Sequence, residues 1–422
     1  MSQIFVSEPW QRTTSAQPSC HSPPSQIASR PYAVTGSSCG FHLHRSSAFT
    51  PQVQTVQAIL IADNNATNFR PFSGTESVAL LPLANVLMID YALETLHRRG
   101  VMEMFVFSSL HYQNFRKNIV LLFGKSLASA SWAIGMTVHV IGTEGCRCFG
   151  DAMRELDRKR LICGHFILLN ANSITNSNLK FILEQHKKTV TCDKGTVATL
   201  VFKQASTHIR SGSEVLIAMD TQNERSHHDC VYQELSSDFG GFSHNLEIAL
   251  LHNLIDPEIA IGSPCMLSLF SDNFDFETRI HFVRGILINE EILGNRIYIS
   301  LLPRQHYVRK VNNLFSYQIV SNDIINRWTY PLVLDMEQHL QKCYRILILI
   351  GQNCRLHYVF IFDNVIVEDN CLLELCAIGC GSKIAANCEL KGVIVDYNCT
   401  VSNNSQLTKS KMFSSFLKNE KL

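Results

Sequence analysis

The sequence lacks a surplus of charge of either sign. Its 422 residues carry 37 lysines and arginines against 36 aspartates and glutamates, which leaves a formal net charge of +1. No long basic or acidic run is present, so we expect neither a nucleic acid nor an anionic membrane surface as the main partner. Hydrophobic residues make up 46% of the chain, which is enough for most of it to bury a sizeable core.

The sequence also lacks an apolar run long enough to cross a bilayer, which takes about 20 residues. The longest candidate, residues 79–89, is short and contains Pro82 and Asn85. None of the fifteen cysteines follows the spacing of a secreted disulfide framework, and no signal peptide precedes them. We therefore expect reduced thiols and a cytosolic location.

Hydrophobic periodicity is poor in residues 1–54, which are rich in Ser, Pro and Thr. Such a composition cannot offset the entropy of ordering by burial, so we predict a disordered N-terminal tail. Its few arginines weakly resemble those of a mitochondrial transit peptide, but a tail without a targeting role is the simpler interpretation.

Strands and helices alternate after this tail. Apolar runs typical of buried strands occupy residues 57–62, 104–107, 166–169 and 196–202. One face of an intervening helix is formed by Ile89, Ala92, Leu93 and Leu96. Gly100 follows and is expected to end that helix. This βαβ order predicts an α/β domain with a doubly wound, mostly parallel sheet at residues 55–335.

Aliphatic residues recur with a different period after residue 360. They lie six residues apart within a group and seventeen apart between groups, at Val367, Leu373, Ile378, Ile384, Leu390, Val395, Val401 and Leu407. This is the hexapeptide pattern of a parallel β-helix, and it predicts about two and a half coils. We place the β-helix at residues 364–408, after a connector at 336–363 and before a tail at 409–422. Because so short a solenoid leaves its end coils open, we expect a partner subunit to cover one end or flank.

An α/β domain followed by a hexapeptide β-helix is the layout of sugar-nucleotide pyrophosphorylases and their relatives. Within that group, the chain resembles the epsilon subunits of eukaryotic translation initiation factor 2B. The segments that carry the resemblance are QAILIADNNATNFRPF at 57–72, LLPLANVLMIDYALETL at 80–96, LFSDNFDFETRIHFVRGILINEEILGNRIYI at 269–299 and NRWTYPL at 326–332. The resemblance implies a nucleotidyltransferase-like domain followed by a left-handed β-helix.

The residues that an active nucleotidyltransferase needs are largely missing. The turn that begins at Asp63 contains no glycine, Arg70 is retained, and residues 79–82 carry no lysine. Asn172 stands where the family has a metal-holding aspartate, and an amide brings no negative charge to Mg²⁺. We interpret Asp63, Arg70 and Asn172 as a degenerate nucleotide site and expect no cofactor, no metal and no nucleotidyl transfer. The alternative is a working sugar-phosphate nucleotidyltransferase with unconventional phosphate contacts.

The resemblance implies a role in guanine nucleotide exchange. In the family, the epsilon subunit pairs with a gamma subunit, joins the larger complex and helps to exchange GDP for GTP on translation initiation factor 2. An Asn-Phe motif on a loop contributes to binding that G protein, and it matches Asn273–Phe274. The pattern alone favours another interpretation, in which Phe274 and Phe276 alternate into the core of a strand.

The sequence departs from the family after the β-helix. Family members continue through an acidic linker into a helical-repeat domain that carries most of the exchange activity. This sequence ends at Leu422 without such a domain. The resemblance therefore implies a subunit that assembles, and that by itself exchanges nucleotide weakly or not at all.

Overall fold

The computed structural model describes residues 4–6, 55–62, 69, 72, 77–84, 86–108, 136–142, 146, 148–205, 214–220, 228–231, 248–332 and 348–412. Most of the predicted tails at residues 1–54 and 409–422 lie outside these residues. Asp63 and Arg70 also lie outside them. Among the described residues, no helix is long and apolar enough to cross a membrane.

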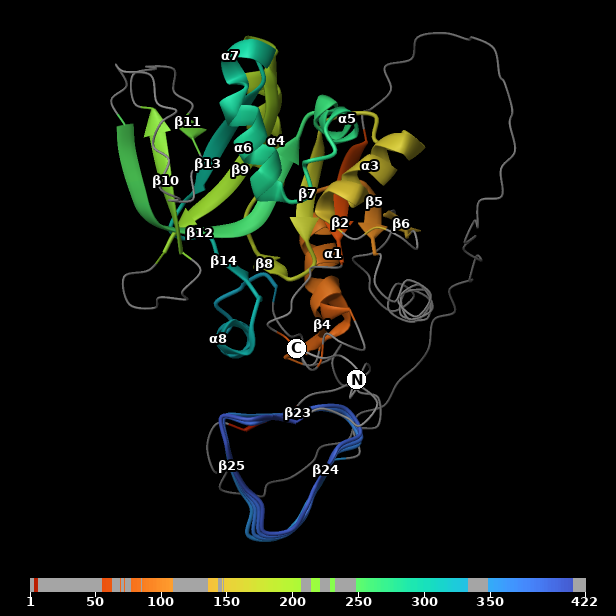
Figure 1. Cartoon of the computed structure of the whole chain (residues 1–422), viewed down its shortest axis with the longest axis vertical. Helices are drawn as coiled ribbons and strands as arrows, with labels where there is room; N and C mark the ends of the chain where they lie inside the picture. The colour runs from red at the N-terminus through yellow and green to blue at the C-terminus, as the bar shows by residue number, and fades with distance from the viewer. Residues whose placement is uncertain are drawn as a thin grey trace, which may run out of the picture. The chain divides into compact units, whose positions relative to one another are not determined.

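A nine-stranded mixed sheet forms the centre of the α/β domain (Figure 1), in the order β10–β11–β13–β9–β12–β7–β2–β5–β6. The strands are β2 (Val56–Ile61), β5 (Val101–Phe107), β6 (Thr137–Ile141), β7 (Phe166–Asn170), β9 (Thr196–Gln204), β10 (Glu214–Asp220), β11 (His228–Val231), β12 (Ile248–Gly262) and β13 (Arg296–Leu302). One parallel block contains β6, β5, β2 and β7, and a second contains β9 and β13. Between them β12 runs antiparallel to both of its neighbours β7 and β9. The predicted doubly wound sheet is confirmed, with this reversed strand near its middle.

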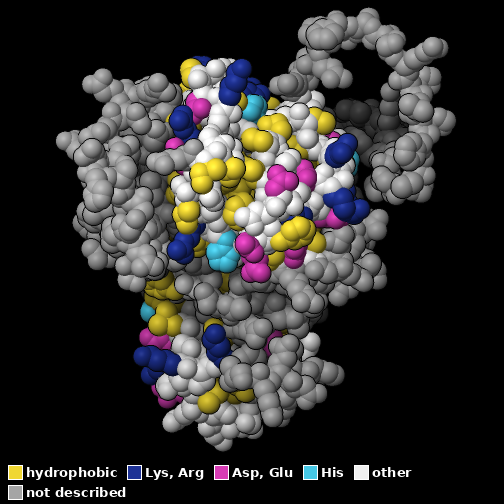
Figure 2. Space-filling view, turned by 45° about the horizontal axis from the view of Figure 1, so that its top comes forward, with side chains coloured by type: hydrophobic (Ala, Val, Ile, Leu, Met, Phe, Trp, Pro, Cys, Tyr) yellow, Lys and Arg dark blue, Asp and Glu magenta, His cyan; other side chains and the backbone are white. Residues whose placement is uncertain are grey.

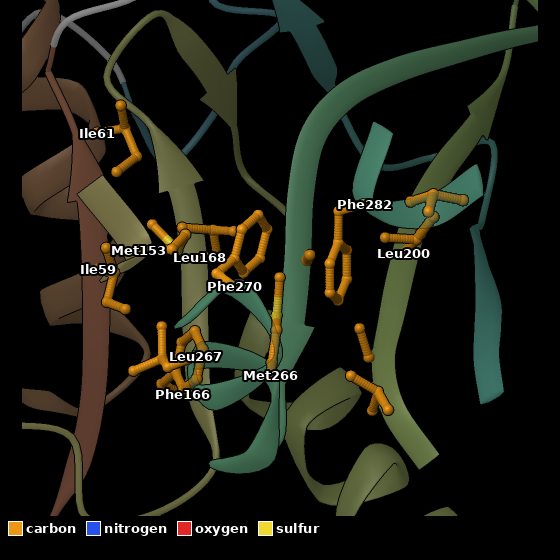
Figure 3. Packing of buried hydrophobic residues seen from close by; sticks show 14 of the residues in the cluster. Ile59, Ile61, Met153, Phe166, Leu168, Leu200, Met266, Leu267, Phe270 and Phe282 are labelled. Atoms are coloured by element: carbon orange, nitrogen blue, oxygen red, sulfur yellow. The ribbon is translucent and has the colours of Figure 1, made fainter. Parts of the chain in front are cut away.

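Helices cover both faces of the sheet. The helices of the described residues are α1 (Met88–Arg98), α3 (Phe149–Lys159), α4 (Leu179–Cys192), α5 (Cys265–Asp272), α6 (Arg279–Ile288), α7 (Glu290–Leu293) and α8 (Leu314–Ile325), and α1 and α3 to α6 pack on the sheet. Apolar residues of α3, α5 and α6 pack in one core cluster with alternate residues of β2 and β5. Apolar residues of α1 and α4 pack in a second cluster, on the opposite face, with the remaining residues of the same two strands. Figure 3 shows Met153, Met266 and Phe270 meeting in the first cluster.

The predicted helix with a face of four apolar residues is α1. All four of these side chains are buried. The helix ends as expected, because Gly100 adopts a φ of +79° and its N–H donates to the carbonyl of His97 at 2.9 Å. A positive φ costs glycine little, which explains its place after the last turn.

Short elements join the sheet to the rest of the chain. They are η3 (Val78–Leu80), β3 (Pro82–Leu83), β4 (Val86–Leu87), β8 (Ser173–Thr175) and β14 (Val308–Lys310). The pair β3–β4 is an antiparallel hairpin, and β14 runs antiparallel to β8. The pairing of β8 with β14 brings the segment after β7 against the segment after β13.

Residues 349–412 form a parallel β-helix, which Figure 1 shows with triangular coils. Its strands are β15 (Leu349–Ile350), β16 (Arg355–His357), β17 (Val359–Ile361), β18 (Ile366–Val367), β19 (Leu372–Glu374), β20 (Ala377–Ile378), β21 (Lys383–Ile384), β22 (Glu389–Lys391), β23 (Ile394–Val395), β24 (Thr400–Val401), β25 (Gln406–Thr408) and β26 (Lys411–Met412). Each side of the triangle is a stack of four parallel strands from four successive coils. Seven of the eight predicted aliphatic side chains are buried, and Leu407 is partly buried.

The β-helix is longer than the sequence pattern predicted, since four coils replace about two and a half. The first coil lies in the residues predicted to be a connector. A step of seventeen residues back from Val367 leads to Ile350, and Leu349 pairs with Ile366 in the register of the later coils. The same step reaches Leu356 and Ile361, so the signal for a further coil was present in the sequence.

The corners of the coils repeat every seventeen residues as well. Residues with positive φ occupy three series, Asn353–Asn370–Asn387–Asn404, Tyr358–Leu375–Gly392–Lys409 and Asn364–Gly381–Asn398. Asparagine and glycine tolerate this left-handed backbone best, so most corners carry one of them. Tyr358 and Leu375 adopt it at a cost of about 1–2 kcal/mol relative to a right-handed backbone.

Buried and partly buried thiols link successive coils. Sγ of Cys354, Cys371 and Cys388 donates to a carbonyl oxygen fourteen residues further on, at 3.0, 3.2 and 3.1 Å. Cys376 does the same at 3.2 Å. Burial raises the pKa of Cys371 and Cys376, so both remain protonated donors at neutral pH.

Aromatic contacts join the α/β domain to the β-helix. Phe72 packs edge-on against Phe362 and Tyr397, with ring centroids 5.3 and 5.5 Å apart. The ring centroids of Tyr317, on α8, and Phe360 are 5.0 Å apart.

Residues 4–6 are an exception to the predicted N-terminal tail, because they form strand β1 (Ile4–Val6), which pairs antiparallel with β17. An exposed strand edge offers unpaired backbone groups for such pairing.

Candidate functional site

The loop between α5 and α6 carries the predicted Asn-Phe motif, and side chains fix it at both ends. Asn273 ends α5, and its N–H donates to the carbonyl of Leu269 at 3.2 Å. Oδ1 of Asn273 accepts a hydrogen bond from the N–H of Asp275 at 2.9 Å, which closes an Asx turn. Thr278 begins α6, and its hydroxyl oxygen accepts from the N–H of His281 at 3.1 Å. Asn273 therefore sets the shape of this loop.

The two phenylalanines of this loop point to different environments. The Phe274 side chain is 73% exposed, whereas Phe276 is 7% exposed. Phe276 packs edge-on against Phe270 and Phe282, with ring centroids 5.9 and 5.4 Å apart. Figure 3 shows the rings of Phe270 and Phe282. The predicted strand with both rings in the core is wrong, because the segment is a loop that buries Phe276 alone.

Two glycines allow the loop to lie close to its neighbours. A Cβ atom at Gly150 would lie 1.9 Å from the carbonyl oxygen of Phe276, and one at Gly285 would lie 2.3 Å from the Phe276 ring. The N–H of Gly150 also donates to the carbonyl of Glu277 at 2.9 Å. The first turn of α3 therefore supports the loop from behind, at a distance that only glycine permits.

A guanidinium lies against the exposed ring. Cζ of Arg154, on α3, is 5.1 Å from the centroid of the Phe274 ring. Nη1 of Arg154 donates to the carbonyl of Phe270 at 3.3 Å, and Nη2 donates to Oδ1 of Asp151 at 2.9 Å. The Arg154 side chain is only 14% exposed. This contact was not predicted, since no sequence period relates α3 to the loop.

Three exposed residues close to Phe274 in the sequence are acidic. Asp272, Asp275 and Glu277 are all exposed, and Ile280 in the first turn of α6 adds partly exposed apolar surface. Figure 2 shows lysines and arginines interspersed with acidic residues on the face in view. The loop thus presents one large apolar side chain, with three exposed carboxylates close to it in the sequence and the largely buried Arg154 against the ring.

Of the predicted degenerate nucleotide site, the structure describes Asn172. It follows β7, at the end of the sheet where parallel strands present ligand-binding loops in doubly wound folds. Its side chain is 3% exposed, and Nδ2 donates to the carbonyl of Val311 at 3.0 Å. Within the described part of the chain, its Oδ1 has no hydrogen-bond partner. The amide is therefore directed to the protein backbone.

Two carboxylates of β12 are paired with cations. Glu258 has a φ of +56° and contacts both Asn170 and Lys310 through its carboxylate oxygens. Arg279 pairs with Asp256 at 3.0 Å. Among the residues that the structure describes, no cluster of three or more His, Cys, Asp or Glu side chains could hold a metal ion.

The fold defines the class of protein, which is a nucleotidyltransferase-like α/β domain followed by a parallel β-helix. No model of a protein family matches the chain. The chain is 29% identical over 332 residues to the Schizosaccharomyces pombe protein "Translation initiation factor eIF2B subunit epsilon", which covers 76% of this chain and 46% of that protein. It is 33% identical over 289 residues to the Dictyostelium discoideum protein of the same description, covering 66% of this chain and 40% of that protein.

These matches make the chain an eIF2B epsilon-like protein over the matched residues. The chain spans less than half the length of the two curated relatives that it matches.

Proposed function

We propose that this chain is an epsilon-like subunit of an eIF2B-type guanine nucleotide exchange factor. It promotes the exchange of GDP for GTP on translation initiation factor 2, and it does so by binding that G protein rather than by nucleotidyl transfer. The observation that carries this proposal is the exposed Phe274 ring on a loop with a defined shape, in a chain similar to two eIF2B epsilon subunits.

The exposure of Phe274 supports a role in binding. Burying a phenylalanine side chain against a partner contributes about 1.5–3 kcal/mol, which makes it a candidate hot spot. The hydrogen bond from Asp275 to Asn273 fixes the loop before any partner arrives, so little backbone entropy is lost on binding. Asn273 thus supports the contact by shaping the loop, and Phe274 supplies the apolar area.

The charge around the ring indicates the chemistry of the partner. Asp272, Asp275 and Glu277 are exposed carboxylates within three residues of Phe274 along the chain. A complementary surface has an apolar pocket with lysine or arginine at its rim, and such complementarity raises the association rate and suppresses wrong partners. We propose that the G protein presents a surface of this kind to the loop.

Asn172 supports the non-enzymatic part of the proposal. Its Nδ2 is engaged with the carbonyl of Val311, and the amide carries no charge to offer a divalent cation. Asp63 and Arg70 complete the degenerate nucleotide site in this proposal. A working sugar-phosphate nucleotidyltransferase is the alternative, and it would release pyrophosphate from a nucleoside triphosphate in the presence of Mg²⁺.

The proposal includes a gamma-type subunit, the rest of the eIF2B complex and a cytosolic location. Exposed apolar side chains on the first two coils support the presence of another subunit. Leu349 and Ile366 are neighbours in paired strands and are 59% and 39% exposed, and Ile350 of the first coil, which pairs with the buried Val367, is 43% exposed. Exposed apolar side chains on the flank and at the end coil of a solenoid are typical of a contact surface.

The proposed function is tested by the release of labelled GDP from purified initiation factor 2, with the chain alone and with its gamma partner. Phe181→Ala is a matched control for Phe274→Ala, because Phe181 is a 55% exposed phenylalanine on α4. We expect acceleration that Phe274→Ala abolishes and Phe181→Ala preserves. Equal acceleration by both variants would contradict a role for this loop, and pyrophosphate release from a nucleoside triphosphate would favour the enzyme.

A further inference from the structure

A residue outside the loop lies against the Phe274 ring. We infer that Arg154 is a positioning residue, whose guanidinium holds the ring in the outward orientation that the partner binds. This inference rests on the proposed function of Asn273 and Phe274. It adds a residue of α3 to the binding site and explains how an exposed side chain keeps one orientation.

The backbone of the loop is fixed by hydrogen bonds, but these do not fix the ring. A side chain that is 73% exposed can exchange between staggered rotamers, because little surrounds it. Each rotamer that binding must exclude lowers the affinity. A guanidinium 5.1 Å from the ring centroid favours the rotamer that keeps this contact, since the π face of the ring attracts a cation.

Arg154 itself is held by contacts that do not involve the ring. Its two terminal nitrogens donate to the carbonyl of Phe270 and to Asp151, and Nη2 lies 3.9 Å from Sγ of Cys148. The Phe270 carbonyl belongs to the last turn of α5, where exposed carbonyls and the helix dipole favour a cation. The guanidinium is therefore in place before the ring packs on it, so the contact selects the ring orientation.

Arginine suits this position better than lysine. Its planar guanidinium can lie on a ring and still donate from its edge to two acceptors, whereas an ammonium group is a compact point charge. We therefore expect Arg154→Lys to keep part of the effect and Arg154→Met to remove it. Arg158→Met is the matched control, because Arg158 lies one turn further along α3 and pairs with Glu155.

The first test uses the free chain and needs no partner. The chain is labelled with fluorophenylalanine, and the fluorine resonance of position 274 is assigned by its disappearance in Phe274→Ala. We expect Arg154→Met to shift this resonance toward the value of a solvated ring, Arg154→Lys to shift it less, and Arg158→Met to leave it unchanged. An unchanged resonance in Arg154→Met would overturn the inference.

The second test measures binding to purified initiation factor 2. Arg154→Met is expected to weaken binding about two- to fivefold, which is the size of an exposed to partly buried cation–π contact. In the Phe274→Ala background the same substitution should have no further effect. A similar loss in both backgrounds would show that Arg154 does not act through the ring, and thermal melting of each variant checks that it is folded.

The two tests separate this inference from the proposed function. If Phe274→Ala binds the G protein as well as the wild type, the proposed function fails and the positioning role fails with it, whatever the resonance does. If Phe274→Ala weakens binding while Arg154→Met changes neither the resonance nor the affinity, the proposed function stands and the positioning role alone is overturned.

Discussion

Acidification is expected to destabilise the α/β domain through His186, a buried residue of α4. Nδ1 of His186 lies 2.8 Å from the hydroxyl of Thr199, and Nε2 lies 3.0 Å from the hydroxyl of Ser263. Ser263 donates its single hydroxyl proton to the carbonyl of Thr196 at 2.8 Å. The Ser263 oxygen must therefore accept a hydrogen bond from the protonated Nε2, which leaves Nδ1 without a proton and able to accept a hydrogen bond from the Thr199 hydroxyl. The hydrogen bonds thus fit the neutral imidazole with its proton on Nε2.

The size of the effect follows from the shift in protonation. Burial, with smaller effects from the charges of His165 and Lys187, lowers the pKa of His186 from 6.5 to about 3. Because the unfolded chain binds the proton more tightly, the stabilisation is complete above pH 6.5 and is lost as the pH falls toward 3. Within this window each pH unit costs about 1.4 kcal/mol, so the free energy of unfolding should fall by about 2 kcal/mol between pH 7 and pH 5.

The assay is urea unfolding at several pH values, for the wild type and for His186→Gln. The glutamine amide can still donate to Ser263 but does not titrate. The variant should be less stable at pH 7 by about 1 kcal/mol, because its fit is poorer. It should also lose about 2 kcal/mol less than the wild type between pH 7 and pH 5. Equal losses for the two proteins in this interval would refute the assignment of the pH dependence to His186.

Two further substitutions test the loop support and the coil corners. Gly150→Ala should displace the loop from α3 and lower the stability by about 1–3 kcal/mol, because its Cβ would overlap the Phe276 carbonyl. The control is Gly164→Ala, whose Cβ would meet nothing within 4 Å, and equal melting temperatures for the two variants would contradict this packing. Leu375→Asn should raise the stability by about 1 kcal/mol in urea unfolding, because the exposed Leu375 adopts a φ of +53° that asparagine tolerates better. A lower stability of this variant would argue against strain at that corner.

Much of the fold was predictable because its signals repeat along the chain. The apolar face of α1 and the seventeen-residue step of the β-helix are periodic, and both were confirmed. The first coil was not predicted, although Ile350, Leu356 and Ile361 continue the seventeen-residue step. The reversal of β12 was not predictable, since a buried strand is apolar whichever way it runs.

The candidate site was predictable only in part, because a loop has no period. The resemblance to a known family singled out Asn273 and Phe274, whereas the alternation of phenylalanines suggested a strand. Phe276 is the buried ring because Gly150 and Gly285 allow close approach to it. Arg154, which contacts Phe274, lies far from it in the sequence. Such long-range contacts leave no pattern in a single sequence.

The most direct test of the central claim is the affinity of this chain, paired with its gamma partner, for purified initiation factor 2. Because Phe274 is proposed as a hot spot, Phe274→Ala should weaken binding about tenfold or more, while Phe181→Ala should bind like the wild type. If Phe274→Ala binds as tightly as the wild type and Phe181→Ala, the loop between α5 and α6 is not the surface that this protein uses to bind its G protein.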